Sequence, residues 1–128
     1  MTDKDLMLKA KEASMNAYVP YSHFPVGAAL ECDNGRIFTG CNVENAAFGS
    51  TICAERTACC KAVSEGFRKF KRIAIYAESQ DWCTPCGACR QFLAEFCTEG
   101  DIEVLCAKAG GRYVSYKLSE LLPKTFNF

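Results

Sequence analysis

Two short cysteine motifs, far apart in the chain, constrain this sequence more than any other feature. The first is Cys53-Ala54-Glu55 and the second is Pro85-Cys86-Gly87-Ala88-Cys89. Together they supply three thiolates, and cysteine sulfur is a preferred zinc ligand in tetrahedral sites. Three protein ligands leave the fourth position open for water, as in a catalytic zinc site. The fold is therefore expected to bring Cys53 to Cys86 and Cys89.

A carboxylate follows the first of these cysteines by two residues. Zinc lowers the pKa of bound water from about 15.7 to about 7, and the resulting hydroxide can attack an sp² carbon that bears an amino group. Glu55 is close enough in sequence to Cys53 to take the proton of that water and pass it on. The alternative is a carboxylate that only stabilises a helix N-terminus. The combined pattern resembles the signature of zinc-dependent deaminases.

Other residues near the motifs leave alternatives open. Cys83 or His23 would close the zinc site as a fourth ligand and make it structural. Cys83-Thr84-Pro85-Cys86 is also a C-x-x-C pair, but a redox role leaves Cys53-Ala54-Glu55 unexplained. Arg56 would draw negative charge from three thiolates, and the alternative is a solvated helix arginine.

Composition narrows the class of protein. The chain has 128 residues, which predicts a single domain, 1–128, and its 15 basic residues balance 15 acidic ones. Balanced charge argues against a nucleic-acid binder, and no apolar stretch is long enough for a membrane span. We expect no export signal at the N-terminus and reduced thiols in the cytoplasm. Six cysteines are expected to be buried or half-buried: Cys32, Cys41, Cys59, Cys60, Cys97 and Cys106.

Periodicity and turn signals predict an α/β layered domain with one mixed five-stranded sheet. Helices are expected over residues 2–18, 53–65 and 86–97, with a helical turn at 119–122. Strands are expected over residues 26–32, 36–43, 72–78, 102–107 and 112–117. Both ligand sets then lie at helix starts, where unpaired N–H groups favour negative charge.

Five segments resemble cytidine deaminase in its small, homotetrameric, three-cysteine form, over nearly the whole chain. They are residues 20–30, 40–46, 53–58, 85–91 and 120–123, of which Asn42-Val43-Glu44-Asn45 is the most specific. The resemblance implies a three-layer α-β-α fold and one Zn²⁺ per chain, held by Cys53, Cys86 and Cys89, with Glu55 as the catalytic residue. Arg56 would support the ligands.

The same resemblance implies a nucleoside site. Its substrate-binding residues would be Phe24, Asn42, Glu44, Ala46, Ala54 and Phe126. Asn42 and Glu44 would bind the ribose, chiefly its 3′-hydroxyl, and Phe24 would pack on the pyrimidine. Ala46 and Phe126 would act from neighbouring subunits. The alternatives are strand-end polarity for Asn42 and Glu44, core packing for Phe24, and packing of Phe126 on its own domain. Phe48 departs from the family pattern, since many relatives have tyrosine there.

These implications predict hydrolysis of cytidine and 2′-deoxycytidine to uridine and 2′-deoxyuridine, with release of ammonia, in pyrimidine salvage. We expect a homotetramer with shared active sites and no nucleic-acid or membrane partner. The alternatives are a related small-molecule deaminase, such as one acting on blasticidin S, a polynucleotide editor, and a non-catalytic binding module stabilised by zinc.

Overall fold

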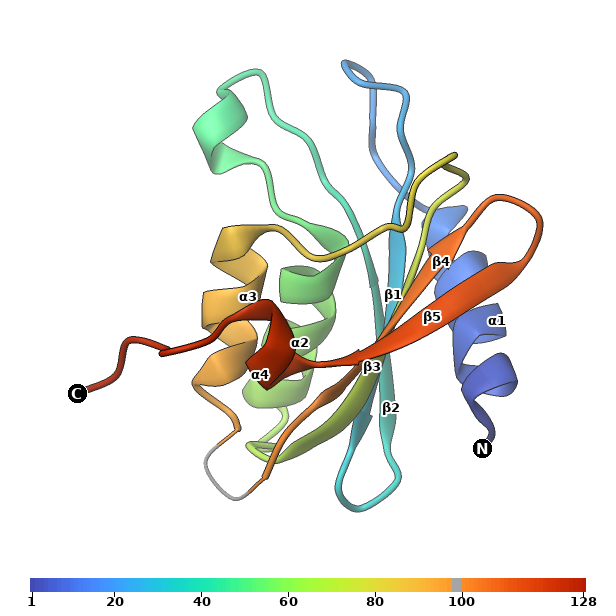
Figure 1. The fold of residues 1–128 in the computed structure, drawn as a ribbon. Coiled ribbons are helices and arrows are strands. Elements are labelled where there is room, and N and C mark those ends of the chain that lie inside the picture. Colours follow the sequence, from blue (N-terminus) through green and yellow to red (C-terminus); the bar gives the residue numbers. More distant parts are fainter. Residues whose placement is uncertain (98–99) are drawn as a thin grey trace.

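Five strands form one mixed sheet in the computed structural model, which describes residues 1–97 and 100–128 (Figure 1). The strands are β1 (Gly27–Cys32), β2 (Ile37–Cys41), β3 (Phe70–Tyr76), β4 (Glu103–Lys108) and β5 (Arg112–Lys117). Their spatial order is β2-β1-β3-β4-β5. β3 and β4 run parallel, and every other neighbouring pair is antiparallel. The expected mixed five-stranded sheet is confirmed.

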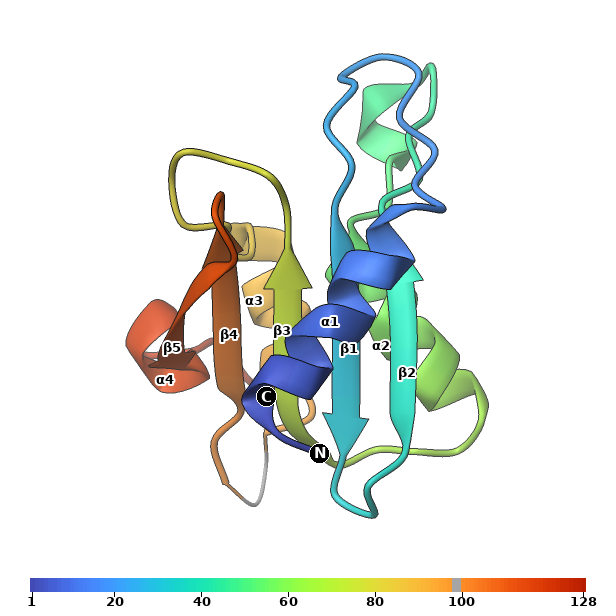
Figure 2. The ribbon, with the colours of Figure 1, turned by 90° about the vertical axis from the view of Figure 1, so that its right-hand side faces the viewer.

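Helices cover both faces of this sheet. Helix α1 (Asp3–Ser14) crosses one face, and α2 (Ala54–Ser64) and α3 (Gly87–Ala94) lie on the other (Figures 1 and 2). The four-residue helix α4 (Leu118–Leu121) follows β5 on the side of α3. The three-layer α-β-α arrangement predicted by the resemblance is therefore present.

The strand β1 shows why both faces need a helix layer. All six of its residues are buried, as expected for a central strand covered on both sides. Successive side chains point to opposite faces. Leu30 packs into the apolar cluster beneath α2 and α3, whereas Ala29 packs into the smaller cluster that contains Leu6 and Ala10 of α1.

The first helix begins as its sequence predicts but ends earlier. The Thr2 hydroxyl accepts a hydrogen bond from Asp5 N at 3.1 Å, and the Asp5 carboxylate accepts one from Thr2 N. The helix ends at Ser14 rather than at residue 18. Tyr18 instead donates its N–H to the carbonyl of Asn42 at 3.0 Å, so a tertiary contact overrides the helical periodicity.

Other element ends also differ from the expectation. β2 ends at Cys41 rather than at residue 43, and α3 ends at Ala94 rather than at residue 97. A single turn of 3₁₀ helix, Phe48–Ser50, lies within the expected loop. Within the described part of the chain, none of the helices has the length and apolar character that crossing a bilayer requires.

The cysteine placements are mostly as expected. Cys32, Cys59 and Cys106 are buried, and Cys41 and Cys97 are partly buried. The prediction for Cys60 was wrong, because its side chain is exposed. Cys60 follows the buried Cys59 on α2, and adjacent residues of a helix do not share a face.

Candidate metal centre and substrate site

Three cysteine sulfurs meet where α2 and α3 begin. Cys53 is the N-cap residue of α2, Cys86 is the N-cap residue of α3, and Cys89 lies in the first turn of α3. The Sγ atoms of Cys53 and Cys86 are 3.8 Å apart, and those of Cys86 and Cys89 are 3.4 Å apart. All three sulfurs lie within 4.8 Å of one another. The fold thus unites the two motifs, as the sequence predicted.

The sulfur spacing fits one zinc ion. A tetrahedral zinc with Zn–S bonds of about 2.3 Å separates its sulfur ligands by about 3.8 Å. Neither Cys83 nor His23 belongs to the group of ligating atoms found among residues 1–97 and 100–128. Three soft ligands without a fourth side chain match a zinc site that keeps one position open.

The surroundings of the sulfurs favour negative charge. Arg56 donates from Nη2 to Sγ of Cys53 at 3.5 Å. A hydrogen bond with Cys89 is the largest influence that lowers the pKa of Cys53 to about 5; burial opposes it and Arg56 reinforces it. The N-termini of α2 and α3 add partial positive charge at the same place. The predicted contact of Arg56 with the ligands is therefore present.

A buried carboxylate lies beside the sulfurs. Glu55 is the second residue of α2 and only 5% exposed. Burial, together with the negative charge of Cys53, raises the pKa of Glu55 to about 7. A carboxyl group with a pKa near neutral can both accept and donate a proton under ordinary conditions.

Asn42 and Glu44 hold the loop at residues 20–25. Asn42 Oδ1 accepts from Val26 N and its Nδ2 donates to the Phe24 carbonyl, both at 2.9 Å. Glu44 Oε1 accepts from the N–H groups of Tyr21 and Ser22, each at 3.1 Å, and Oε2 accepts from the Ser22 hydroxyl. A carboxylate offers about four acceptor sites, so one remains on Glu44 for a ligand.

The segment that carries these two residues is joined to the metal centre through the backbone. Val43 and Ile52 exchange hydrogen bonds of 2.9 and 3.0 Å, and Val43 also pairs with Tyr18. Because Ile52 precedes Cys53, this bridge places Asn42 and Glu44 close to the first metal ligand in a fixed register.

The remaining candidates lie around the same end of the sheet. Phe24 is 41% exposed, and Ala54 is fully buried at the start of α2. Ala46 is exposed in the loop that follows Glu44. Phe48 is 73% exposed and its ring meets that of Tyr21 edge to face, with centroids 5.9 Å apart. Figure 2 shows that the loop at residues 20–25 and the loop that follows Glu44 lie at one end of the molecule.

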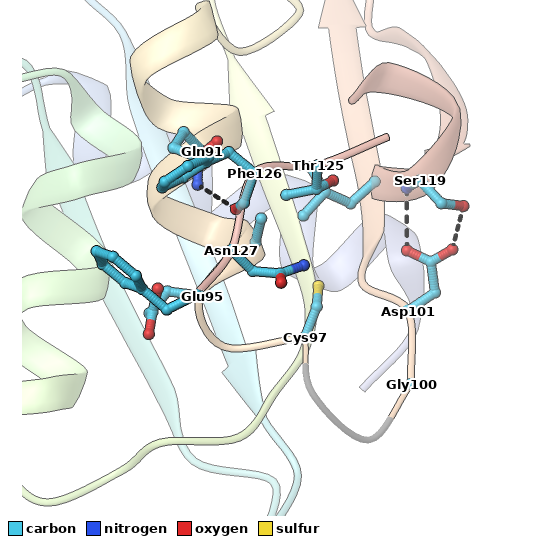
Figure 3. A pocket seen from close by; sticks show the side chains of 12 residues that line it. Gln91, Glu95, Cys97, Gly100, Asp101, Ser119, Thr125, Phe126 and Asn127 are labelled. Atoms are coloured by element: carbon cyan, nitrogen blue, oxygen red, sulfur yellow. Dashed lines mark hydrogen bonds between the residues drawn. The ribbon is translucent and has the colours of Figure 1, made fainter. Parts of the chain in front are cut away.

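Phe126 lies elsewhere, at a groove between α3, α4 and the C-terminal segment (Figure 3). The groove has a volume of about 920 Å³, and none of the three zinc-site cysteines lines it. The Phe126 carbonyl accepts a hydrogen bond from Gln91 Nε2 at 3.2 Å, while the residue stays 69% exposed. Within its own chain, Phe126 therefore does not join the metal centre.

The model of one protein family, described as the cytidine and deoxycytidylate deaminase zinc-binding region, matches residues 1–104. The chain belongs to this family. The matched region contains Cys53, Glu55, Cys86 and Cys89. Because the region is described as zinc-binding and the three sulfurs fit one ion, Zn²⁺ is the metal of this deaminase-family site.

Individual relatives agree with this assignment. A cytidine deaminase from Sporosarcina psychrophila is 47% identical over 127 residues, covering 99% of this chain and 93% of the relative. A probable cytidine deaminase from Dictyostelium discoideum is 50% identical over 119 residues, covering 92% and 79%. The crystal structure of a cytidine deaminase from Burkholderia pseudomallei superposes with a TM-score of 0.93 at 43% identity, covering 98% and 100%.

Two residues of this deaminase-family site were not assigned from the sequence. Ser22 contacts Glu44 across a loop, and Arg90 donates to the carbonyls of Pro85 and Leu121, both at 2.7 Å. Arg90 thereby joins the loop before Cys86 to the C-terminal segment. Both residues lie inside segments that carry the resemblance, but no spacing rule indicates these long-range contacts.

Proposed function

We propose that this chain is a zinc-dependent enzyme that hydrolyses cytidine and 2′-deoxycytidine to uridine and 2′-deoxyuridine, releasing ammonia. The observation that carries the proposal is the three-sulfur cluster without a fourth side-chain ligand, with the buried carboxylate of Glu55 beside it, among the residues described. The relatives of this chain from Sporosarcina and Burkholderia are cytidine deaminases.

In this proposal the chain's own residues manage protons and charge. Bound zinc supplies the Lewis acidity that makes water nucleophilic near neutral pH. Glu55 takes up the two protons of the water in turn and delivers one to the ring nitrogen and the other to the departing amine. A C–O bond forms as the C–N bond to the amino group breaks, so one water is consumed for each ammonia released. Arg56 moderates the negative charge of the ligands.

Asn42 and Glu44 would recognise the sugar. The acceptor site left on Glu44 and the second N–H of Asn42 can both reach a ribose hydroxyl group, chiefly the 3′-hydroxyl. A site built to pair with a hydroxyl discriminates strongly against a substrate that lacks it. Phe24 would pack on the pyrimidine ring, and Ala54 would contact the substrate at the start of α2.

A homotetramer with shared active sites is part of the proposal. Phe48 and Phe126 are 73% and 69% exposed, and Tyr18 is 56% exposed. Exposed aromatic groups of this kind favour a partner surface. Ala46 and Phe126 would complete the pocket of a neighbouring subunit. The balanced charge of the chain favours a small nucleoside over a nucleic acid as its ligand.

The proposed setting is pyrimidine salvage in the cytoplasm, with residues 1–128 as a single domain. Each of the ten cysteines lies in the described part of the chain and is outside any disulfide, which fits a reducing compartment.

An ultraviolet assay with zinc analysis tests the activity. Purified protein would be offered cytidine, 2′-deoxycytidine, free cytosine and blasticidin S, with zinc measured on the same sample. Turnover of the two nucleosides, with about one zinc per chain, is expected. Turnover of blasticidin S alone would favour the related small-molecule deaminase.

The variant Glu55→Gln separates an enzyme from a zinc-stabilised binding module. It should keep its zinc and lose at least about a hundredfold in kcat, because the proton carrier is gone. Unchanged turnover in this variant would rule out the assigned role of Glu55, and no turnover by the zinc-loaded wild type would favour the module.

A further inference from the structure

The hydroxyl group of Ser22 links two candidate substrate residues. It accepts a hydrogen bond from Phe24 N at 3.1 Å and donates one to Glu44 Oε2. The other carboxylate oxygen of Glu44 receives the N–H groups of Tyr21 and Ser22. The Ser22 side chain therefore engages the Glu44 carboxylate directly.

These contacts fix the direction of the carboxylate. With Oε1 engaged by two backbone donors and Oε2 by the hydroxyl, Glu44 cannot rotate without losing a hydrogen bond. The Ser22 hydroxyl is also the largest influence that lowers the pKa of Glu44 below its ordinary value. The carboxylate is thus held ionised, with one acceptor site facing away from the loop donors.

The path of the loop does not depend on that hydroxyl. His23 N donates to the Val19 carbonyl at 3.1 Å, and Tyr18 N donates to the Asn42 carbonyl at 3.0 Å. Asn42 holds Phe24 and Val26 from the other side. Ser22 is exposed, so its hydroxyl can be removed without leaving a cavity. Loss of the hydroxyl should free one oxygen of Glu44 and leave the backbone in place.

We infer that Ser22 is a positioning residue for nucleoside recognition, whose hydroxyl aims the Glu44 carboxylate at the sugar. The inference rests on the proposed function. Ser22 acts through Glu44, so its effect belongs to sugar binding and not to proton transfer.

The test compares Ser22→Ala with Ser22→Thr, which keeps a hydroxyl, on cytidine and on 2′,3′-dideoxycytidine. For Ser22→Ala we expect the KM for cytidine to rise about tenfold, as for loss of one charge-assisted hydrogen bond, with kcat changed less than about twofold. The KM for dideoxycytidine should change less than about twofold, because that substrate lacks the 3′-hydroxyl that Glu44 would bind. For Ser22→Thr we expect a KM for cytidine close to the wild-type value.

Ser115→Ala is the matched control, since the Ser115 hydroxyl also donates to a carboxylate, that of Glu103 at 3.0 Å, on the edge strand β5. It should leave both KM values unchanged. Equal losses on the two substrates, a loss confined to kcat, or no loss at all would each overturn the role of Ser22. A zinc-loaded wild type that turns over neither substrate refutes the proposed function, and the inference with it.

Discussion

Arg56 Nη2 lies 3.5 Å from Sγ of Cys53, one helical turn away on α2. The same nitrogen is 3.4 Å from the Thr51 carbonyl, so the guanidinium spans the entry to the helix. In the part of the chain that the structure describes, Nε of Arg56 is buried without a hydrogen-bond partner. An unpaired buried donor costs free energy, so its retention beside the sulfurs indicates an electrostatic role.

Arg56→Ala should weaken zinc binding. The substitution removes the positive charge and the donor that favour the thiolate form of Cys53, and loss of such supporting contacts typically lowers metal affinity about 10–100-fold. Competition with a chromophoric chelator at neutral pH measures the change. Arg36→Ala is the control, because the Arg36 guanidinium pairs with the exposed Glu65 at 3.4 Å and lies over the rings of Phe38 and Phe67 rather than beside the sulfurs. Equal zinc affinity in wild type and Arg56→Ala would contradict the role.

Cys83→Ser should leave zinc content and turnover unchanged. Burial raises the pKa of the Cys83 thiol to about 11. Its sulfur also lies outside the ligand group formed by the other three cysteines. Metal analysis should find about one zinc per chain in Cys83→Ser and much less in Cys86→Ser. Loss of zinc from Cys83→Ser would identify a fourth ligand and a structural site.

How far the sequence predicts this site depends on the distance between the contacting residues. Cys86 and Cys89 are three positions apart at a helix start, so their meeting follows from local geometry. The meeting of Cys53 with them was expected from the ligand needs of zinc and from the deaminase pattern, because no periodicity relates residues so far apart in the chain. The contact of Ser22 with Glu44 spans 22 positions and depends on a loop whose path is set by tertiary hydrogen bonds.

The secondary structure can likewise be predicted only as far as local sequence patterns determine it. The strand expected over residues 26–32 is confirmed as β1, in which Leu30 and Ala29 are buried in separate apolar clusters. The end of α1 could not be predicted, since alanines continue the helical pattern to residue 17. The pairing of Tyr18 with Asn42 decides where the helix stops.

Gly40→Ala should destabilise the protein and disturb the metal centre. A Cβ at Gly40 would lie 2.5 Å from Ala58 N and 2.7 Å from the Ala54 carbonyl, which are backbone atoms of α2. The helix that carries Glu55 and Arg56 would have to move, and overpacking of this kind costs about 1–3 kcal/mol. Urea unfolding and zinc content measure the two effects.

Gly49→Ala is the control for this substitution, because no atom of the described residues lies within 4 Å of the added Cβ. It should change the free energy of unfolding by less than about 0.5 kcal/mol. If Gly40→Ala were as stable and as zinc-rich as Gly49→Ala, the close approach of β2 and α2 would not constrain the site.

Glu31→Gln should remove a pH-dependent part of the stability. Glu31 Oε1 accepts from Arg72 Nε at 2.6 Å, with side chains 8% and 11% exposed, and Asp3 also pairs with Arg72. Burial raises the pKa of Glu31, but the hydrogen bond and charge of Arg72 outweigh it, so the net pKa lies below its ordinary value of 4.5. The carboxylate therefore stabilises the fold fully above about pH 4.5, and its contribution is lost as the pH falls through the lowered pKa.

We expect Glu31→Gln to lower the free energy of unfolding by about 2 kcal/mol at pH 7, since a charged hydrogen bond contributes about 1.5–3 kcal/mol. Urea titrations from pH 7 to pH 3 measure the difference between wild type and variant, in which zinc release common to both cancels. The difference should shrink below about pH 4.5, as the wild-type carboxylate becomes protonated. Glu65→Gln, from an exposed pair, should cost less than about 0.5 kcal/mol throughout. A difference for Glu31→Gln that stays constant with pH would show that Arg72 does not hold Glu31 ionised.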